Sequence, residues 1–283
     1  MRPFSEGSPT CVARRARNPM AGRRVDVEIA SRGLTTSREA ARAAVLAGRV
    51  TVDGVPVTKA GHSVSPDAVI EVAGAQRYVS RGGTKLEGAL DRWQLDVTGA
   101  SALDVGASTG GFTDCLLQRG AASVTALDVG YGQLAWRLRT DERVRVVERT
   151  NIRTADAATL GGPYDVVVID VSFISLEKVL PAVLPIVSSS GVVLALVKPQ
   201  FEAGKGRVGK KGVGRDPAVH RDVLEAVVTL ANGQGWVVRG LTWSPITGPE
   251  GNIEFWIWLA RTGEPVTDTP ESVVRMAHEV LGG

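Results

Sequence analysis

Four charged residues stand where predicted secondary-structure elements begin or end, and together they could move a proton. Lys85 lies near the start of a predicted helix, Asp170 and Lys198 end apolar stretches, and Glu254 opens another. A lysine acts as a base when burial or a nearby cation lowers its pKa, and carboxylates hold ammonium groups in position. Each residue taken singly could be a surface charge. The four together predict proton transfer from a bound hydroxyl group.

Short apolar stretches that alternate with helical stretches would position these residues. We predict strands at residues 102–105, 124–129, 144–148, 164–171, 191–197, 236–243 and 253–260. Such alternation is typical of an α/β fold, a parallel sheet with helices on both faces. Only the turn-rich segment 244–252 joins the last two strands, so we expect them to form an antiparallel hairpin. By analogy of fold, this is the seven-stranded, Rossmann-like plan of class I methyltransferases that depend on S-adenosylmethionine.

The segment LDVGASTGGFTD, residues 103–114, predicts a strand, a glycine-rich turn and a helix. Such a turn lets a ligand approach the backbone at the carboxyl edge of the sheet, although a tight turn without a ligand is the alternative. A dinucleotide fingerprint needs a second glycine soon after Gly106, and Ala107 and Ser108 stand there instead. A P-loop needs a lysine after the glycines, where Phe112 stands. An acidic strand with small residues suits a cationic ligand without phosphates.

Two more residues extend this predicted site toward a nucleoside. Asp128 ends the second strand, where a carboxylate can accept both ribose hydroxyls; a helix cap or a solvated turn is the alternative. Asn151 follows the third strand, near the expected place of an adenine ring, and is a weaker candidate. The predicted cofactor-binding residues are Asp104, Gly106, Ala107, Ser108, Thr109, Gly110, Gly111, Phe112, Asp128, Asn151 and Asp170.

The sequence after the fourth strand narrows the class of methyl acceptor. DVSF, residues 170–173, lacks both prolines of the N/D-P-P-Y/F motif that is usual in methyltransferases acting on exocyclic amino groups. Methylation of a base carbon needs a cysteine nucleophile, but Cys11 lies in the N-terminal tail and Cys115 inside the helix after the glycine turn. A hydroxyl acceptor remains, and its reaction needs an in-line approach and a base.

The beginning of the chain is basic and has a different pattern. Residues 1–85 hold 14 Lys and Arg against 7 Asp and Glu, whereas the remainder holds 19 against 23. This asymmetry indicates a polyanionic partner, with a solvated basic surface as the alternative. Two predicted helices, within 23–33 and 36–48, precede a hairpin at 50–57 and a strand at 69–74. The arginines of this module are Arg23, Arg24, Arg32, Arg38, Arg42 and Arg49.

A second basic segment follows Lys198. Residues 204–210 read G-x-x-x-x-G-K, but Lys211 stands where a P-loop requires Ser or Thr, so the match is accidental. The next helix is expected to start only at Asp216 and Pro217. We predict that this glycine-rich loop contacts nucleic-acid phosphates through Lys205, Arg207, Lys210 and Lys211.

The motifs SRGGTKL, LDVGASTGGFTD, LDVGYGQL, DVSFISL, LVKPQFE and GNIEF resemble the TlyA (haemolysin A) family of rRNA ribose 2′-O-methyltransferases, within the FtsJ-like group. The resemblance runs from about residue 22 to residue 262. It implies S-adenosylmethionine as cofactor, with Gly106, Ser108, Gly110 and Asp128 at its binding positions. It also implies a catalytic tetrad that matches Lys85, Asp170, Lys198 and Glu254. Lys198 would be the base, Asp170 and Lys85 would orient it and the ribose, and Glu254 would complete the charge network.

The resemblance also implies partners and domains. Family members carry an N-terminal alpha-L RNA-binding domain and modify cytidine riboses in 16S rRNA, 23S rRNA or both, in ribosomal subunits, which affects sensitivity to capreomycin-type antibiotics. Both basic segments would then contact rRNA. We divide the chain into a disordered basic tail (1–21), an RNA-binding domain (22–76), a linker (77–84), a methyltransferase domain (85–265) and a C-terminal tail or helix (266–283).

Several other classes of protein are disfavoured. No apolar run approaches the roughly 20 residues of a membrane span, and no N-terminal stretch has the apolar core of a signal peptide. Two cysteines make no disulfide framework. We therefore expect a cytoplasmic protein with neither a metal site nor a membrane partner. Two rival functions stay open: a membrane-active haemolysin, and an rRNA-binding assembly factor without enzymatic activity.

Overall fold

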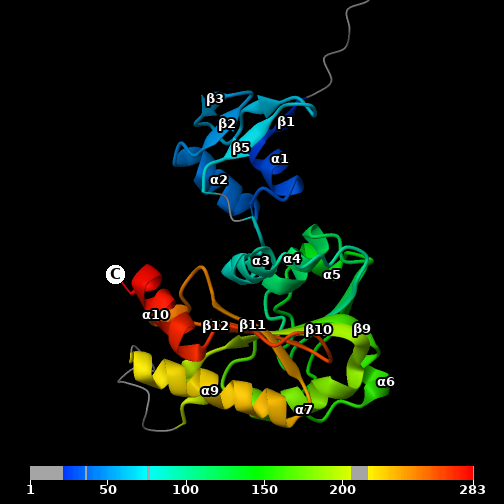
Figure 1. The fold of residues 1–283 in the computed structure, drawn as a ribbon. Helices are drawn as coiled ribbons and strands as arrows, with labels where there is room; N and C mark the ends of the chain where they lie inside the picture. The colour runs from blue at the N-terminus through cyan, green and yellow to red at the C-terminus, as the bar shows by residue number, and fades with distance from the viewer. Residues whose placement is uncertain (1–21, 36, 75–76, 205–215, 283) are drawn as a thin grey trace, which may run out of the picture. The chain divides into compact units, whose positions relative to one another are not determined.

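A computed structural model of the chain describes residues 22–35, 37–74, 77–204 and 216–282. These residues form two compact units, one up to residue 75 and one from residue 76 onward (Figure 1). The predicted tail 1–21, with Cys11, lies outside the described residues, as do Lys205, Arg207, Lys210 and Lys211 of the predicted basic loop.

The first unit packs two short helices against short strands. The helices are α1 (Val25–Ser31) and α2 (Arg38–Leu46), and the strands are β1 (Arg23–Arg24), β2 (Val50–Val52), β3 (Val55–Val57), β4 (Ser63–Val64) and β5 (Ile70–Val72). Strand β2 pairs with β3 and with β5, and β1 pairs with β4; all three pairings are antiparallel. The hydroxyl of Ser37 caps α2 by accepting a bond from the Ala40 amide. Both predicted helices and the predicted hairpin are confirmed; the β1–β4 pair was not predicted.

The second unit is built on one mixed sheet. Its strands are β6 (Ser101–Val105), β7 (Ser123–Leu127), β8 (Val144–Val147), β9 (Tyr164–Ile169), β10 (Val187–Val197), β11 (Val237–Trp243) and β12 (Phe255–Ala260). Their order across the sheet is β11-β12-β10-β9-β6-β7-β8. Strand β12 is inserted between β11 and β10 and runs antiparallel to both. The predicted seven-stranded fold class and its final hairpin are confirmed.

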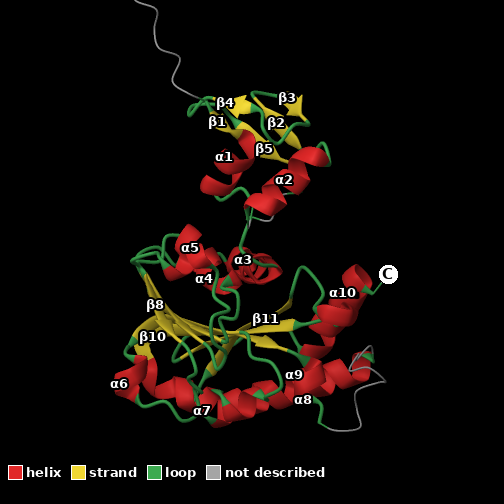
Figure 2. Ribbon diagram, turned by 180° about the vertical axis from the view of Figure 1, so that it is seen from behind, coloured by secondary structure: helices red, strands yellow, loops and turns green. Residues whose placement is uncertain are grey.

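Helices cover both faces of this sheet (Figure 2). One face carries α3 (Arg81–Trp93), α4 (Gly111–Gln118) and α5 (Trp136–Arg139). The other carries α6 (Ala157–Leu160), α7 (Leu180–Val183), α8 (Pro199–Glu202), α9 (Pro217–Gly233) and α10 (Pro270–Leu281), with the 3-10 turns η1 (Leu176–Lys178) and η2 (Leu184–Ile186). A third 3-10 turn, η3 (Pro249–Gly251), lies between β11 and β12. Helix α9 begins at the predicted cap, Asp216, whose side chain accepts a bond from the Ala218 amide.

The central strands are apolar because both of their faces are buried. In β9, Val166 and Val168 belong to the core beneath α3 and α4, whereas Val167 and Ile169 belong to the core beneath α7 and α9. A strand covered on both sides shows a continuous apolar run instead of an alternating one. This burial accounts for the run YDVVVI that predicted the strand.

The structure places part of the predicted linker in the second unit. Tyr78 is 1% exposed in the core beneath α3 and α4, and α3 begins at Arg81, capped by the Ser80 hydroxyl. Helices α3 and α4 approach closely, since a Cβ added to Gly111 would lie 2.9 Å from the backbone nitrogen of Gly83. Only a residue without a side chain allows this approach. It holds Lys85, one turn into α3, above the carboxyl edge of the sheet.

Candidate active site

The four predicted catalytic side chains form two ion pairs at the carboxyl edge of the sheet. Lys85 Nζ lies 2.5 Å from Glu254 Oε2, and Lys198 Nζ lies 2.5 Å from Asp170 Oδ1. Asp170 follows β9 and Lys198 follows the neighbouring parallel strand β10, so both side chains meet at one edge. Glu254 directly precedes β12, and because β12 runs antiparallel its amino end lies at the same edge.

The Lys85–Glu254 pair is enclosed by protein. The two side chains are 10% and 1% exposed. The segment between β11 and β12 folds over Glu254: the Ser244 amide donates to its carbonyl, and a Cβ on Gly248 would lie 2.3 Å from its Oε1. Ionised groups tolerate such burial only as a pair, so each member of this pair depends on the other.

The Lys198–Asp170 pair is more open. The Asp170 side chain is 21% exposed, against 9% for Lys198. Lys198 Nζ also donates to the hydroxyl of Ser172, at 3.1 Å. The lysine ammonium therefore lies between a carboxylate and a hydroxyl that belong to the same short segment after β9.

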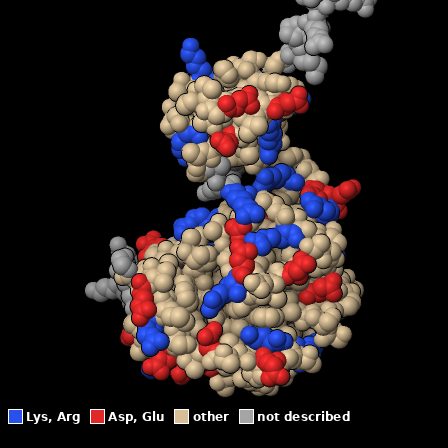
Figure 3. Space-filling model, turned by 45° about the horizontal axis from the view of Figure 1, so that its top comes forward, with Lys and Arg blue, Asp and Glu red and all other residues tan. Residues whose placement is uncertain are grey.

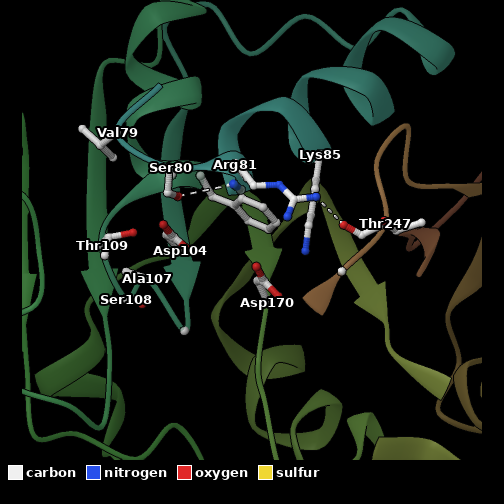
Figure 4. Close-up of a pocket in the computed structure, with 15 residues that line it drawn as sticks. Val79, Ser80, Arg81, Lys85, Asp104, Ala107, Ser108, Thr109, Asp170 and Thr247 are labelled. Atoms are coloured by element: carbon white, nitrogen blue, oxygen red, sulfur yellow. Dashed lines mark hydrogen bonds between the residues drawn. The ribbon is translucent and has the colours of Figure 1, made fainter. Parts of the chain in front are cut away.

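Two cavities meet at Asp170. The α3 cavity, of about 420 Å³, is lined by the first turn of α3, Lys85, Asp104 and the glycine turn (Figure 4). The Asp128 cavity, of about 500 Å³, is lined by Asp128, Asn151, Ile152 and the segment 170–174. Gly106, Ser108 and Asp170 line both cavities. Asp170 therefore borders two ligand-sized spaces.

Asp104 is fully buried at the floor of the α3 cavity. Its Oδ2 accepts bonds from the Thr113 amide at 2.9 Å and the Thr113 hydroxyl at 2.7 Å. Its Oδ1 has no hydrogen-bond partner within the described parts of the chain. Burial, with smaller contributions from Asp170 and Asp128, raises the pKa of Asp104 to about 7.

The glycine turn brings backbone atoms close to the sheet edge. Gly106 has φ +88°, and a Cβ there would lie 2.6 Å from the carbonyl oxygen of Asp170. Ala107, Ser108, Thr109, Gly111 and Phe112 line the α3 cavity. Gly110 stays a predicted cofactor-binding residue. Gly110, at φ +94°, lines neither cavity and packs against Leu138, whose Cδ1 would lie 2.3 Å from an added Cβ.

Asp128 is held by two backbone amides. Its Oδ2 accepts a bond from Ser108 at 2.7 Å and its Oδ1 one from Gly130 at 2.6 Å. Asn151 is exposed on the rim of the same cavity, and its side-chain oxygen accepts a bond from the Arg153 amide. The carboxylate is thus fixed in direction, and each of its oxygens has a second lone pair to offer a ligand.

The sequence did not single out several residues at this site. Phe173 is 91% exposed at φ +64°, and its ring lies 5.0 Å from that of Phe201. A large apolar residue shortly after the predicted catalytic Asp170 was a usable signal. The other wall of the α3 cavity comprises Ser80, Arg81, Gly82, Thr247 and Gly248, and Arg81 donates to the Thr247 carbonyl at 2.7 Å. No local sequence pattern indicates the contact between Arg81 and Thr247.

Four arginines of the first unit form ion pairs with two carboxylates. Arg24 and Arg38 pair with Asp26, and Arg23 and Arg32 pair with Glu28. Hydrogen bonds from Arg24 and from Arg32 lower the pKa of Asp26 and Glu28, respectively. Lys and Arg are accordingly interspersed with Asp and Glu on the face in Figure 3.

Arg32 is the arginine most tied to the rest of the unit, whereas Arg42 and Arg49 are the least tied. Arg32 also donates to the carbonyls of Ala68 and Pro66, which ties α1 to the segment before β5. This arginine therefore has a structural role within the unit. Arg42 and Arg49 are exposed and have no ion-pair partner among the residues that the structure describes. These two are the arginines best placed to meet a phosphate.

No helix in the described ranges is long and apolar enough to cross a membrane. No group of three or more His, Cys, Asp or Glu side chains is arranged there to hold a metal ion.

The chain is similar to known methyltransferases. Residues 78–261 match the FtsJ-like methyltransferase family, and residues 23–70 match the S4 domain. The 16S/23S rRNA (cytidine-2′-O)-methyltransferase TlyA of Mycobacterium tuberculosis is 49% identical over 83% of this chain and 89% of that protein. Hemolysin A of Brachyspira hyodysenteriae is 41% identical over 82% and 97%. A hemolysin-named structure from Streptococcus thermophilus superposes with a TM-score of 0.70 at 44% identity, covering 93% and 98%.

Proposed function

The chain belongs to the TlyA (haemolysin A) family of FtsJ-like methyltransferases, and on this premise we propose that it methylates the ribose 2′-hydroxyl of a cytidine in ribosomal RNA. The observation that carries the proposal is the Lys198–Asp170 pair at the junction of two cavities. One cavity can hold part of a methyl donor while the pair contacts an acceptor hydroxyl. The substrates are the small or large ribosomal subunits, so the enzyme works in the cytoplasm.

The residues around the two cavities fit S-adenosylmethionine. Asp104 offers an oxygen that lacks a partner among the described residues and can accept a bond from an ammonium group. Asp128 offers the free lone pairs of a fixed carboxylate to ribose hydroxyls. Gly106 lets the ligand approach the backbone, and Asn151 borders the same cavity as Asp128. When bound, this cofactor supplies an activated methyl group.

Lys198 is the proposed base. A ribose hydroxyl is a weak nucleophile while it keeps its proton. The Lys198 ammonium first releases one proton to solvent, and the neutral amine then takes the hydroxyl proton as the oxygen attacks. Asp170 and Ser172 hold the lysine nitrogen from two sides, at 2.5 and 3.1 Å. Lys85, held by Glu254, lines the same cavity as Asp170 and orients the ribose. Proton transfer by a positioned side chain contributes about 10²- to 10⁴-fold to a rate.

Phe173 is the proposed platform for the target base. Its ring is almost fully exposed beside the reactive pair, and Phe201 supports it. Proteins that act on unstacked nucleotides often stack the base on an aromatic ring. Such stacking would hold the cytosine while its ribose reaches Lys198.

The first unit is proposed to hold rRNA through phosphate contacts. Arg42 and Arg49 are exposed and available, and Arg23, Arg24 and Arg38 present partly exposed guanidinium groups beside their carboxylates. Changing Arg42 and Arg49 to Gln removes two phosphate contacts and should reduce the slope of log affinity against log salt by about 2. Arg32→Gln should instead lower the stability of the unit. Lys205, Arg207, Lys210 and Lys211 stay predicted RNA contacts.

The test is methyl transfer to separated ribosomal subunits. Small and large subunits from a strain that lacks this activity are incubated with the protein and S-adenosylmethionine carrying a labelled methyl group. Reverse transcription at low nucleotide concentration then maps the 2′-O-methylated position. We expect label at one cytidine ribose and none with a Lys198→Ala variant. Label on a base, or on neither subunit, contradicts the proposal.

The two rival functions predict different experimental results. An assembly factor would bind subunits without transferring label, and its binding would be insensitive to Lys198→Ala. A haemolysin would lyse erythrocytes as purified protein, with equal potency in that variant. The complete set of paired catalytic residues favours the enzyme, because neither rival function requires two lysine–carboxylate pairs at a ligand cavity.

A further inference from the structure

Asp104 is a buried carboxyl group, and among the described residues only one of its two oxygens has hydrogen-bond partners. Its Oδ2 receives two bonds from Thr113, at the amino end of α4. Its Oδ1 has no donor in the described ranges, although the residue is 0% exposed. A buried oxygen of an ionised carboxylate is costly without a donor, because desolvation disfavours the charge. A proton on this oxygen removes the cost in the free protein.

The groups around Asp104 do not supply a compensating positive charge. Asp170 after β9 and Asp128 after β7 are carboxylates, and both disfavour ionisation of Asp104. Lys85 on α3 lines the same cavity but is paired with Glu254. Arg81, also on α3, directs its guanidinium to the Thr247 carbonyl. Burial, the largest cause, and the carboxylates of Asp170 and Asp128 raise the pKa of Asp104 to about 7, against the hydrogen bonds from Thr113, which lower it.

The opposite wall of the cavity favours a negative group. The first turn of α3, with Ser80, Arg81 and Gly82, lines it (Figure 4). The amino end of this 13-residue helix carries partial positive charge, and Arg81 adds a full one. The α3 cavity thus presents an ammonium acceptor on one side and an anion-binding turn on the other. This polarity fits the zwitterionic end of an α-amino acid.

We propose that the amino-acid end of the cofactor enters the α3 cavity by proton exchange, in which Asp104 releases its proton to solvent as the ammonium group arrives. The proposal rests on the proposed function only for the identity of the cofactor. The O–H bond of Asp104 breaks, its proton passes to the buffer, and the ammonium group keeps its three protons. The carboxylate of the ligand lies against the first turn of α3. Binding therefore releases up to one proton per site.

The sign of the pH dependence follows from the pKa of Asp104. Above about pH 7 the free protein already holds Asp104 as a carboxylate, so affinity is constant and few protons are released. Below it the proton must leave first, and affinity falls by about tenfold for each pH unit. With this pKa, binding releases most of one proton at pH 6 and little at pH 8. A ligand with the same nucleoside and no amino-acid end releases none.

The experiment is calorimetric titration of the full chain at pH 6 and pH 8, each in two buffers of different ionisation enthalpy. The ligands are S-adenosylhomocysteine and 5′-methylthioadenosine, which share the nucleoside and differ in the amino-acid end. We expect release of nearly one proton with S-adenosylhomocysteine at pH 6, little at pH 8, and none with 5′-methylthioadenosine. Equal proton release by both ligands, or none by either, overturns the proposal.

The variant Asp104→Asn provides an independent test of proton exchange. Asparagine can keep the bonds to Thr113 through its oxygen but cannot ionise. We expect about 10- to 100-fold weaker S-adenosylhomocysteine binding at pH 8, as for loss of a bond to a charged group, and no proton release. Unchanged 5′-methylthioadenosine affinity shows that the fold persists. Asp96→Asn, an exposed carboxylate before β6, is the matched control and should behave as wild type.

The outcomes separate this proposal from the proposed function. Wild-type behaviour of Asp104→Asn overturns proton exchange even if methyl transfer to rRNA is found. Failure of S-adenosylhomocysteine to bind at either pH overturns the cofactor assignment as well, and with it the proposed reaction.

Discussion

The two lysine–carboxylate pairs of the active site have the same separation and different surroundings. Lys85–Glu254 and Lys198–Asp170 are both 2.5 Å pairs. Glu254 is 1% exposed beneath the segment between β11 and β12, whereas Asp170 is 21% exposed and borders two cavities. Lys198 also donates a hydrogen bond to the Ser172 hydroxyl.

The difference in exposure indicates that the two ion pairs have different roles. The more deeply buried pair is held together by the cost of leaving either charge alone, so Lys85–Glu254 fastens α3 to the start of β12, with Lys85 lining the α3 cavity. Asp170 is more exposed and lines both cavities, so the Lys198–Asp170 pair can exchange a partner for a substrate atom. We therefore interpret Lys198–Asp170 as the reactive pair and Lys85–Glu254 as the pair that shapes the site. The predictions below test this division.

The largest expected effect is on catalysis by Lys198→Ala. Removing the proposed base should lower methyl transfer to ribosomal subunits by about 10²- to 10⁴-fold. Affinity for S-adenosylhomocysteine should be unchanged, because Lys198 lines neither cavity. Single-turnover transfer of labelled methyl measures the rate, and calorimetry measures the affinity. Near-normal transfer in this variant, with loss in Lys85→Ala, would reverse the roles of the two pairs.

The next effect is on stability. Glu254→Ala leaves Lys85 buried without its partner and should lower the free energy of unfolding by about 3–5 kcal/mol. Asp170→Ala should cost less, because that side chain is partly exposed. Urea denaturation at neutral pH compares the two variants.

A double variant sharpens the comparison. Replacing both members of the enclosed pair, Lys85→Met with Glu254→Leu, should recover most of the lost stability, since apolar residues of similar size can replace a buried ion pair. Activity should not return. An Asp170→Ala variant as unstable as Glu254→Ala would show that the pairs do not differ in the way their exposure indicates.

A smaller effect is expected for Ser172→Ala. Loss of one hydrogen bond to Lys198 should lower kcat by about 2- to 10-fold and leave KM unchanged. Ser172→Thr keeps the hydroxyl and should restore most of the rate. Ser190→Ala, at an exposed position of β10, is the matched control. An equal loss in kcat and in the free energy of unfolding would instead indicate a structural role for Ser172.

Much of the fold was predictable because burial leaves a periodic record in the sequence. Strands such as β9, covered on both faces, read as continuous apolar runs between turn-rich segments. Pairing of β1 with β4 left no such record, because each strand has two residues. The first four residues of β10, VSSS at 187–190, were not predicted as strand because serines interrupt the apolar run.

The site was predictable where it depends on strand ends and unpredictable where it depends on packing. Asp170 and Lys198 follow adjacent parallel strands, so topology alone brings them together. The contact of Arg81 with Thr247 joins residues 166 positions apart and leaves no local pattern. Gly110 packs closely against Leu138, and the spacing of the glycine-rich motif does not reveal this contact.

The smallest effect concerns the support behind the enclosed pair. Phe255 follows Glu254, and the ring of His220 packs against it at 5.3 Å. His220 Nδ1 lies 3.0 Å from His278 Nε2 on α10. Burial lowers the pKa of His278, opposed by Asp216, so the fold favours the neutral ring. Its contribution to stability is therefore present above the unfolded pKa of about 6.5 and is lost as pH falls through the lowered pKa.

Urea denaturation at pH 7.5 and pH 5.5 tests this support. Other groups also titrate in this range, so the difference between wild type and His278→Gln is the informative quantity, and it should shrink at pH 5.5. The same comparison in a Glu254→Ala background shows whether α10 acts through the enclosed pair. A smaller difference there would couple them. If His278→Gln changes the free energy of unfolding equally in both backgrounds, α10 does not act through Glu254. The burial of the Lys85–Glu254 pair would then depend on α3 and the segment between β11 and β12 alone.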